Sequence, residues 1–527
     1  MIILKDCRLE ESSLARSERV FRTTMLVTLV IILSKVSGFV RDMILANYFG
    51  TGMANDAYVS AYSLFYLPVL LFNSCISATL IPLYVQEREQ DGLKLANRFA
   101  SNTINLFAAA SLIIAALFYV LAFPLVRLIY MGFDPGKTRL TVKLVRVMLL
   151  SLTFNITSIS LASLLNASDK YVAAQLTGFP LNVCIIGGAV FFSRRYGIES
   201  IARGVFWANI LQCLMLIPFL NGWFTWSPSL DFTDRRFHKL VTLAGPAMLS
   251  MGMSELNHMI DHALASGLNP GDISAMSYAY RLITFLLGVL MVLLTTIMFS
   301  KMSRLAAEKD REGMLEVLRR CILVISLVAL PIVAVAVVMS TDVIKFAYMR
   351  GRFDMHSVEV TAGILVCYVV GVPFFGLRDF LSRAFHALQD TTTPFRVSCL
   401  VVATNIALNL ILRRIIGARG LALATSIAGC CGMVTMLVLL KKRFGRLGFK
   451  QILPDLLKLI IAAALCAAVC AFMNRVLPPA RGTGRVFIRL AVSTAASMVT
   501  YAAACFLMRV KAVNHFAGDV LKRGRRK

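Results

Sequence analysis

The stretch MLVTLVIILSKVSGFVRDMILANYF, residues Met25–Phe49, is apolar enough to cross a bilayer, yet it carries Lys35, Arg41 and Asp42. A spanning helix needs about 20 mostly apolar residues. A charged side chain at mid-membrane costs at least about 2.5 to 3.5 kcal/mol, so such groups almost always face a cavity or a partner. The stretch therefore predicts a membrane helix whose charged side chains face a polar cavity or a partner within the protein.

The composition extends this prediction to the whole chain. The 527 residues are 58% hydrophobic and 16% charged, with a mean hydropathy of +0.74. This is too apolar for a soluble protein of this length. Hydropathy predicts an all-α polytopic membrane protein of about fourteen transmembrane helices. Their centres lie near Ile32, Leu70, Leu112, Leu152, Ile185, Leu211, Leu249, Leu290, Ala329, Val370, Leu400, Ala428, Ala464 and Ser497.

The basic residues predict the orientation. The first residues are broken by charges and lack a cleavage site, so we expect no signal peptide to be removed. Both ends are basic, and an even number of spans puts them on one side, so both are expected in the cytoplasm. The residues concerned are Arg16, Arg19, Arg22, Lys522, Arg523, Arg525, Arg526 and Lys527. Predicted inward loops at 88–98, 235–239, 301–320 and 441–450 are also basic, although Arg127, Lys137, Arg139, Arg350 and Arg352 fall on the outward side.

The net charge of +27 does not indicate nucleic-acid binding, because the basic residues are scattered over loops without a reading motif. Contact with anionic membrane lipids is the simpler interpretation. The 12 cysteines show neither CxxC pairs nor metal-ligand spacing, so they indicate small core residues. No GxxxxGK[ST] loop is present, and we expect no nucleotide cofactor.

An internal repeat organises the chain. The segment FPLVRLIYMGFD, ending at Asp134, resembles TDVIKFAYMRGRFD, ending at Asp354. SLASLLNASDKY then follows the first and FLSRAFHALQDTT the second, so that Asp134 to Asp169 and Asp354 to Asp390 are nearly equal separations.

A second match lies upstream, where RDMILANYFG and SAYSLF resemble IDHALASGLN and SYAYRLITF. Both matches are offset by about 220 residues and skip six spans, which predicts two six-helix lobes in parallel orientation. We expect a cytoplasmic amphipathic N-terminus at 1–22, lobes at 23–222 and 241–441 joined by a linker at 223–240, two extra helices at 442–510 and a basic tail at 511–527. Two such bundles typically enclose a central site that opens to each side in turn, which favours a transporter.

The first-helix charges leave alternatives open. Lys35 has no acid within one turn, which favours a functional role. Arg41 either serves the same cavity or pairs with Asp42 or Asp56 near the outer end of the helix. A weak point at Ser37 and Gly38 would bend the helix and let both cations reach one cavity.

The second lobe supplies further candidates. Arg281 lies among Tyr278, Tyr280 and Phe285, either stacked on them or facing the cavity. Three cations converging on one chamber would select a phosphate or diphosphate. Arg378, Asp379 and Arg383 alternate in sign and indicate an ion-pair network or a cytoplasmic gate. The polar residues of the seventh helix could line the chamber; they are Glu255, His258, Asp261 and His262. For both histidines a packing role is favoured over proton coupling.

Several of these segments together resemble the MurJ (MviN) family of lipid II flippases, within the multidrug/oligosaccharidyl-lipid/polysaccharide exporter superfamily. They are SKVSGFVRD, FGTGMANDAY, SCISATLIPLY, AGPAMLS, SYAYRLITF, YMRGRFD and SRAFHALQDTTTP, in order from about residue 25 to 440.

The resemblance implies a bacterial inner-membrane protein that moves the undecaprenyl-diphosphate-linked peptidoglycan precursor to the outer leaflet, with the cell-wall synthesis machinery as a partner. It implies that Lys35, Arg41, Asp42, Asp56 and Arg281 bind substrate. Ser34, Gly38, Glu255, Tyr278, Arg378 and Arg383 are candidates for the gate or the cavity wall. The two extra helices would form a groove for the lipid tail.

The chain also departs from the family. It reads LPVLLFNSCIS, residues 67–77, where many relatives carry an arginine and a glutamate in the second helix. Asp261, Asn405 and Asn409 match a sodium-binding pattern of some members, with an asparagine in place of an acid. No other metal or cofactor is expected.

The remaining alternatives are an exporter of other lipid-linked sugars or drugs, a membrane enzyme and an assembly scaffold. An enzyme would need grouped carboxylates or a His-Asp pair at one membrane face, and the loops carry acids singly. A scaffold gains nothing from buried cations. We therefore expect a flippase without catalytic residues, driven by the membrane potential.

Overall fold

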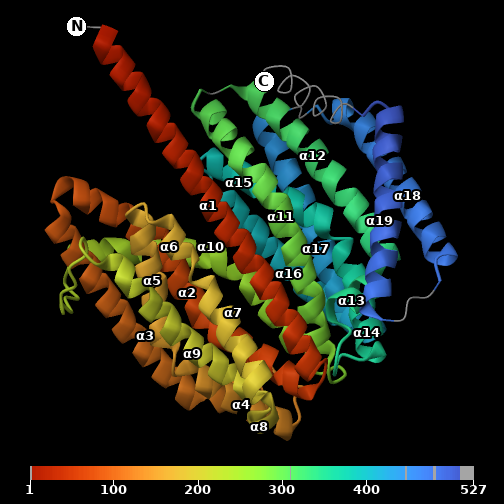
Figure 1. Cartoon of the computed structure of the whole chain (residues 1–527), viewed down its shortest axis with the longest axis horizontal. Coiled ribbons are helices and arrows are strands. Elements are labelled where there is room, and N and C mark those ends of the chain that lie inside the picture. Colours follow the sequence, from red (N-terminus) through yellow and green to blue (C-terminus); the bar gives the residue numbers. More distant parts are fainter. Residues whose placement is uncertain (1–2, 309, 446–447, 479–481, 511–527) are drawn as a thin grey trace. The chain divides into compact units, whose positions relative to one another are not determined.

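A computed structural model of the chain describes residues 3–308, 310–445, 448–478 and 482–510, and every regular element in those ranges is a helix (Figure 1). This confirms the all-α prediction. The basic C-terminal tail predicted at 511–527 lies outside the described residues.

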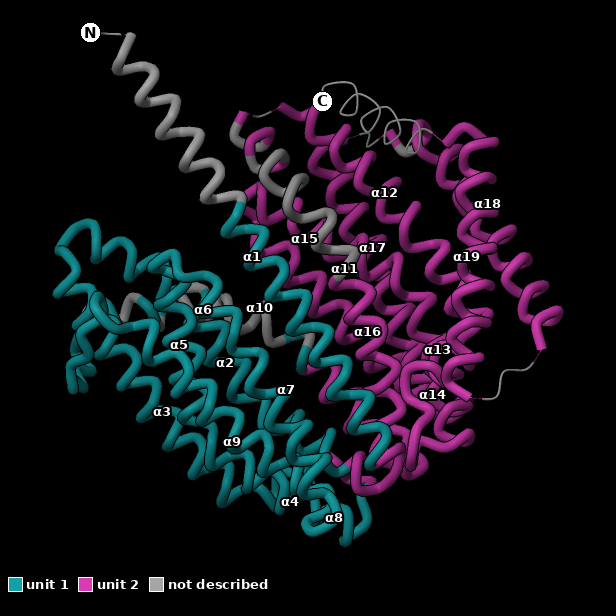
Figure 2. The backbone as a smooth tube through the Cα atoms, in the orientation of Figure 1, with its two compact units in different colours: residues 1–48, 57–129, 133–255 teal, residues 49–56, 130–132, 256–527 magenta. Residues whose placement is uncertain are grey.

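The described chain divides into two compact units (Figure 2). The first takes residues up to 48 together with 57–129 and 133–255, and the second takes 49–56, 130–132 and the residues from 256 onward. The first unit contains most of α1 (Ile3–Phe49) and α2 (Met53–Gln90), followed by α3 (Leu93–Ile129), α4 (Pro135–Leu149), α5 (Leu152–Ala167), α6 (Tyr171–Gln175), α7 (Gly178–Gly187), the π-helical turn η1 (Gly188–Phe192), α8 (Ser193–Tyr196), α9 (Glu199–Leu216), the short η2 (Ile217–Leu220) and the start of α10 (Arg235–Ala265).

The second unit continues from the end of α10. Its helices are α11 (Asp272–Ala307), α12 (Arg311–Val338), α13 (Ser340–Tyr348), α14 (Met355–Val369), α15 (Val372–Ala387), α16 (Thr392–Ile416), α17 (Ala418–Phe444), α18 (Phe449–Val476) and α19 (Thr483–Leu507). The two last helices pack on each other, and α18 also packs on α12.

Ten described helices are long and apolar enough to cross a membrane, or twelve when two bent pairs count as one span each. The bent pairs are α4 with α5 and α14 with α15, and the predicted centres Leu152 and Val370 fall at their breaks. The predicted centres Leu249 and Leu290 fall in α10 and α11. A multi-pass membrane protein is therefore confirmed, whereas the count of fourteen stays a prediction.

The internal repeat is visible in the local structure of the two units. Asp134 caps α4 by accepting from the N–H groups of Gly136 and Lys137, and Asp354 caps α14 by accepting from the N–H of Ser357. The α4–α5 pair bends by 46° and the α14–α15 pair by 44°.

Backbone conformations refine the register of the repeat. Asp169 and Gln389 both have φ of 59°, and Gly197 and Gly417 have φ of 56° and 60°. Gln389, rather than Asp390, is thus the structural counterpart of Asp169. The N–H of Ser357, and then its hydroxyl, hold the pKa of the Asp354 carboxyl below its ordinary value.

Helix packing in the first unit separates a protein face from a lipid face. On α3 the side chains of Leu112, Ile113 and Val120 are 62%, 69% and 71% exposed, as expected for residues that contact acyl chains. Where α7 and η1 cross α9, a Cβ on Gly188 would meet the carbonyl oxygen of Ser200, and one on Gly204 would meet that of Cys184. Small residues allow this close approach of two membrane helices.

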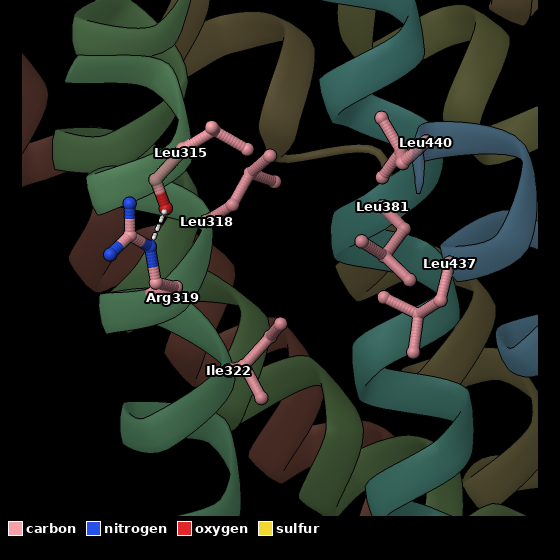
Figure 3. A pocket seen from close by; sticks show the side chains of 7 residues that line it. All are labelled: Leu315, Leu318, Arg319, Ile322, Leu381, Leu437 and Leu440. Carbon is pink, nitrogen blue, oxygen red and sulfur yellow. Dashed lines mark hydrogen bonds between the residues drawn. The ribbon is translucent and has the colours of Figure 1, made fainter. Parts of the chain in front are cut away.

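One apolar crevice in the second unit lies between α12, α15 and α17 (Figure 3). Leucine side chains, among them Leu318 and Leu381, form its wall, and Arg319 stands at its edge. The Arg319 Nε donates to the carbonyl oxygen of Leu315 at 3.2 Å, and its Nη1 donates to Gln451 Oε1 on α18.

Candidate functional site

The two first-helix cations meet different surroundings. Lys35 is exposed, and the described residues give it no hydrogen bond or ion pair. Arg41 is partly buried, with 18% of its side chain exposed. Its Nε donates to Asp42 Oδ1 at 3.0 Å, its Nη2 lies 3.0 Å from the same oxygen, and its Nη1 donates to Asn182 Oδ1 at 3.1 Å. Of the alternatives for Arg41, the pairing with Asp42 is therefore present.

Pairing does not exhaust the donors of Arg41. A guanidinium carries five N–H groups. Among the residues that the structure describes, each of the three nitrogens of Arg41 engages one acceptor, which leaves one N–H on each terminal nitrogen for a further acceptor. Arg41 can thus hold its own acid and still grip an anion.

Asn182, on α7, is the residue of this site that the sequence analysis missed. It is 4% exposed, and its Nδ2 donates to Ser37 Oγ at 2.7 Å and to the carbonyl oxygen of Ser34 at 3.3 Å. Ser34, Ser37 and Arg41 share one face of α1 because they recur every three to four residues. A lone amide in the apolar run of residues 178–189 was the available signal, since such groups need a partner in a membrane.

The weak point predicted at Ser37 and Gly38 does not interrupt α1, which runs as one helix from Ile3 to Phe49. The Ser37 hydroxyl donates to the carbonyl oxygen of Ser34 at 2.8 Å while accepting from Asn182. A Cβ on Gly38 would lie 3.8 Å from the Asn182 amide, so this glycine faces α7.

Asp56 belongs to the second unit and is fully buried. Its carboxylate accepts from the N–H of Gly271 at 2.7 Å and from the N–H and hydroxyl of Ser274, both at 2.8 Å. These groups form the N-terminal end of α11, where a carboxylate is favoured by the helix dipole. Asp56 thus fastens the segment 49–56 to α11, and its role in substrate binding stays a prediction.

The aromatic residues around Arg281 form two groups within the second unit. Tyr278 is buried against Tyr348 and Phe353, with ring centroids 4.8 and 5.6 Å away. Tyr280 lies 4.1 Å from the ring of His258. Arg281 follows on α11 and is partly buried.

The other predicted gate residues are more loosely held. Arg378 Nη2 lies 3.2 Å from Asp379 Oδ1, as the ion-pair interpretation expected, and Arg383 is exposed on α15. Glu255 is exposed on α10.

Asp261 lies in a buried polar cluster within the second unit. It is 1% exposed; Asn409 Nδ2 donates to its Oδ1 at 2.7 Å, and the Thr425 hydroxyl lies 3.2 Å from its Oδ2. Asn405 Oδ1 accepts from Asn409 Nδ2 at 2.7 Å and lies 3.1 Å from Asn257 Oδ1, and Asn405 Nδ2 donates to the Thr425 hydroxyl at 3.1 Å. The sequence thus predicted three members of this cluster and missed Thr425 and Asn257.

The cluster has the ligand chemistry of a hard cation. Carboxylate, amide and hydroxyl oxygens are the groups that such ions prefer. Every hydrogen bond that the described residues give to Asp261 comes from a neutral group. Asn409 Oδ1 is buried, and no residue that the structure describes forms a hydrogen bond with it. A small monovalent cation therefore fits the residues present.

Comparisons with known proteins agree with the sequence motifs. A family model described as lipid II flippase MurJ matches residues 45–492. A lipid II flippase MurJ of Thermosipho africanus is 30% identical over 80% of this chain and 85% of its own length. A probable lipid II flippase MurJ of Rhizobium tropici is 27% identical over 86% of this chain and 87% of its own.

Solved structures show the same relationship. A lipid II flippase MurJ in an inward closed conformation matches with a TM-score of 0.77 and 25% identity, over 92% of this chain and 99% of that one. An inward-facing multidrug resistance MATE transporter of the MOP superfamily shares the fold at 12% identity, with a TM-score of 0.67 over 80% of this chain and 98% of that one. The family model covers most of the chain, and the chain belongs to the lipid II flippase MurJ family.

Proposed function

We propose that this protein moves lipid II, the undecaprenyl-diphosphate-linked peptidoglycan precursor, from the inner to the outer leaflet of the bacterial cytoplasmic membrane. Family membership supports the substrate, because the relatives carry this activity in their names. The observation that carries the chemistry is Arg41, a partly buried arginine in an apolar helix that keeps N–H groups for an anion.

The substrate divides into a part that crosses the membrane readily and a part that does not. The polyprenyl tail stays in hydrocarbon, whereas transfer of the polar head without compensating hydrogen bonds is costly. The protein therefore needs to shelter only the head. We propose a cationic cavity in which Lys35, Arg41 and Arg281 replace the hydration of the diphosphate, with forked contacts from arginine and a point charge from lysine.

Direction would come from alternating access under the membrane potential. The potential acts on a charge at about 2.3 kcal/mol per 100 mV. With a negative interior it favours outward movement of the loaded anion and return of the empty cationic cavity. Both termini would face the cytoplasm, as the basic ends predict.

We also propose that sodium binds at Asp261, with Asn405, Asn409 and Thr425 as further oxygen donors. The orphaned Asn409 Oδ1 and the absence of a charged donor to Asp261 among the described residues support this proposal. When bound, the cation supplies the positive charge that a buried carboxylate otherwise lacks.

The experiment that tests the flippase proposal replaces the cations one at a time. Arg41→Ala and Arg281→Ala should each abolish rescue of cells depleted of their own flippase, with lipid II remaining accessible only from the inner leaflet. The control is Arg414→Ala, an exposed arginine on α16 that has no proposed role; membrane levels of all three variants are measured in parallel. Normal flipping by either cavity variant would remove that residue from the proposed site.

A further inference from the structure

We propose that Asn182 is a positioning residue for Arg41, which it holds in the orientation that grips the diphosphate. This inference rests on the proposed function, since it assigns the residue that prepares Arg41 for that ligand. Its starting point is the contact between α1 and α7, two helices of the first unit that run together in Figure 1.

The hydrogen bonds fix which end of the Asn182 amide meets Arg41. Both N–H groups of the amide are committed to α1, one to Ser37 Oγ and one to the carbonyl oxygen of Ser34. The oxygen is therefore the end that faces the guanidinium. A reversed amide would place its donor against Arg41 and its acceptor against the Ser34 carbonyl oxygen, so two of the three bonds would be lost and the orientation is determined by its partners.

The backbone places Asn182 at the right height on α1. Gly178, four residues earlier on α7, lies so close to Ser34 that a Cβ there would overlap the serine hydroxyl. The two helices are thus in contact at Gly178, and one turn later Asn182 reaches Ser37 and Arg41. Burial of the amide, which is 4% exposed, keeps water from competing for these bonds.

The arrangement selects the face that Arg41 offers. Asp42 takes the edge formed by Nε and Nη2, and Asn182 takes one N–H of Nη1. The two remaining N–H groups sit on the two terminal nitrogens, which is the number that a forked contact with phosphate oxygens uses. Without Asn182, the arginine would lose one of two anchors and would spend less time in this orientation.

The test is a double-mutant cycle on binding of lipid II to the purified full-length protein in nanodiscs. Asn182→Ala and Arg41→Ala should each weaken binding, the former by about tenfold, the size expected for a lost hydrogen bond to a charged group. The double variant should bind no more weakly than Arg41→Ala, because the amide acts only through the arginine.

A buried asparagine elsewhere in the same unit controls for general destabilisation. Asn209 is 1% exposed and bonds to Asn155 and Ser151, away from α1. Asn209→Ala should lower the melting temperature as Asn182→Ala does, yet leave the affinity for lipid II unchanged. Asn182→Asp, which keeps an acceptor but adds a negative charge beside Arg41, should weaken binding more than alanine does.

The outcomes separate this inference from the proposed function. If Arg41→Ala binds lipid II normally, Arg41 is not part of the headgroup site and both proposals fail at this residue. If Arg41→Ala weakens binding while Asn182→Ala does not, or if the two effects add in the double variant, Asn182 is a packing residue and only the positioning role is overturned.

Discussion

Asp42 and Asp261 occupy matching places in the repeat, but their carboxylates meet different neighbours. Asp42 follows Arg41 and pairs with it at 3.0 Å. In the second repeat the position of Arg41 is taken by Ile260, and Asp261 receives hydrogen bonds from neutral groups of the described chain. One repeat thus pairs its aspartate with an arginine, and the other surrounds its aspartate with neutral hydrogen-bond donors of the described chain.

We therefore predict that sodium raises the melting temperature of the purified protein and that Asp261→Asn removes this effect. A ligand that binds only the folded state stabilises it by about 1.4 kcal/mol at ten times its Kd. The measurement compares sodium with choline at constant ionic strength. Asp455→Asn is the control, because Asp455 is equally buried but lies 3.7 Å from Lys458. A sodium response that survives in Asp261→Asn would place the ion elsewhere.

At the scale of the element, two neighbouring glycines at the junction of α7 and η1 allow the effect of helix propensity on stability to be distinguished from the effect of helix packing. A Cβ on Gly187 would meet no atom of the described chain within 4 Å, whereas one on Gly188 would meet the carbonyl oxygen of Ser200 on α9. Alanine favours a helix over glycine by about 1 kcal/mol at either place. Gly187→Ala should therefore raise the melting temperature slightly, and Gly188→Ala should lower it, since overpacking costs about 1 to 3 kcal/mol. Equal effects of the two substitutions would show that α7 and α9 do not pack closely.

The elements were predictable where a local rule demands a particular residue. Asp134 and Asp354 mark the repeat in the sequence because each caps a helix, whereas Gly197 and Gly417 were recognised as a matching pair only from their positive φ angles in the structure. Hydropathy likewise located most of the helices, since lipid requires long apolar runs, but the predicted centres Leu152 and Val370 fall at breaks between helices.

Contacts between distant segments were not predictable in the same way. Asp56 follows Arg41 closely in the chain, and the sequence offers it as a partner for that arginine. In the structure Asp56 binds the N–H groups of Gly271 and Ser274, and a sequence does not reveal which backbone N–H groups a carboxylate will bind. Asn182 reaches Arg41 only because α7 packs on α1. Both contacts join parts of the chain that no periodicity relates.

At the scale of the whole molecule, the proposed driving force has a direct test. A diphosphate carrying two charges across 100 mV gains about 4.6 kcal/mol, twice the value for one charge. Collapsing the potential while the sodium gradient is kept should therefore stop the appearance of lipid II in the outer leaflet of cells that depend on this protein. The measurement is an accessibility assay for lipid II before and after the collapse. Continued flipping would assign the drive to an ion gradient.

The turn at 130–132 and the end of α10 touch backbone to backbone. The Gly132 N–H donates to Ser266 Oγ at 3.2 Å, and a Cβ on Gly132 would overlap the backbone of Gly267. Hydrogen is thus the largest substituent that this corner admits. The methyl group of Gly132→Ala would therefore force the two turns apart. Spin labels placed on these turns should report a longer distance in this variant.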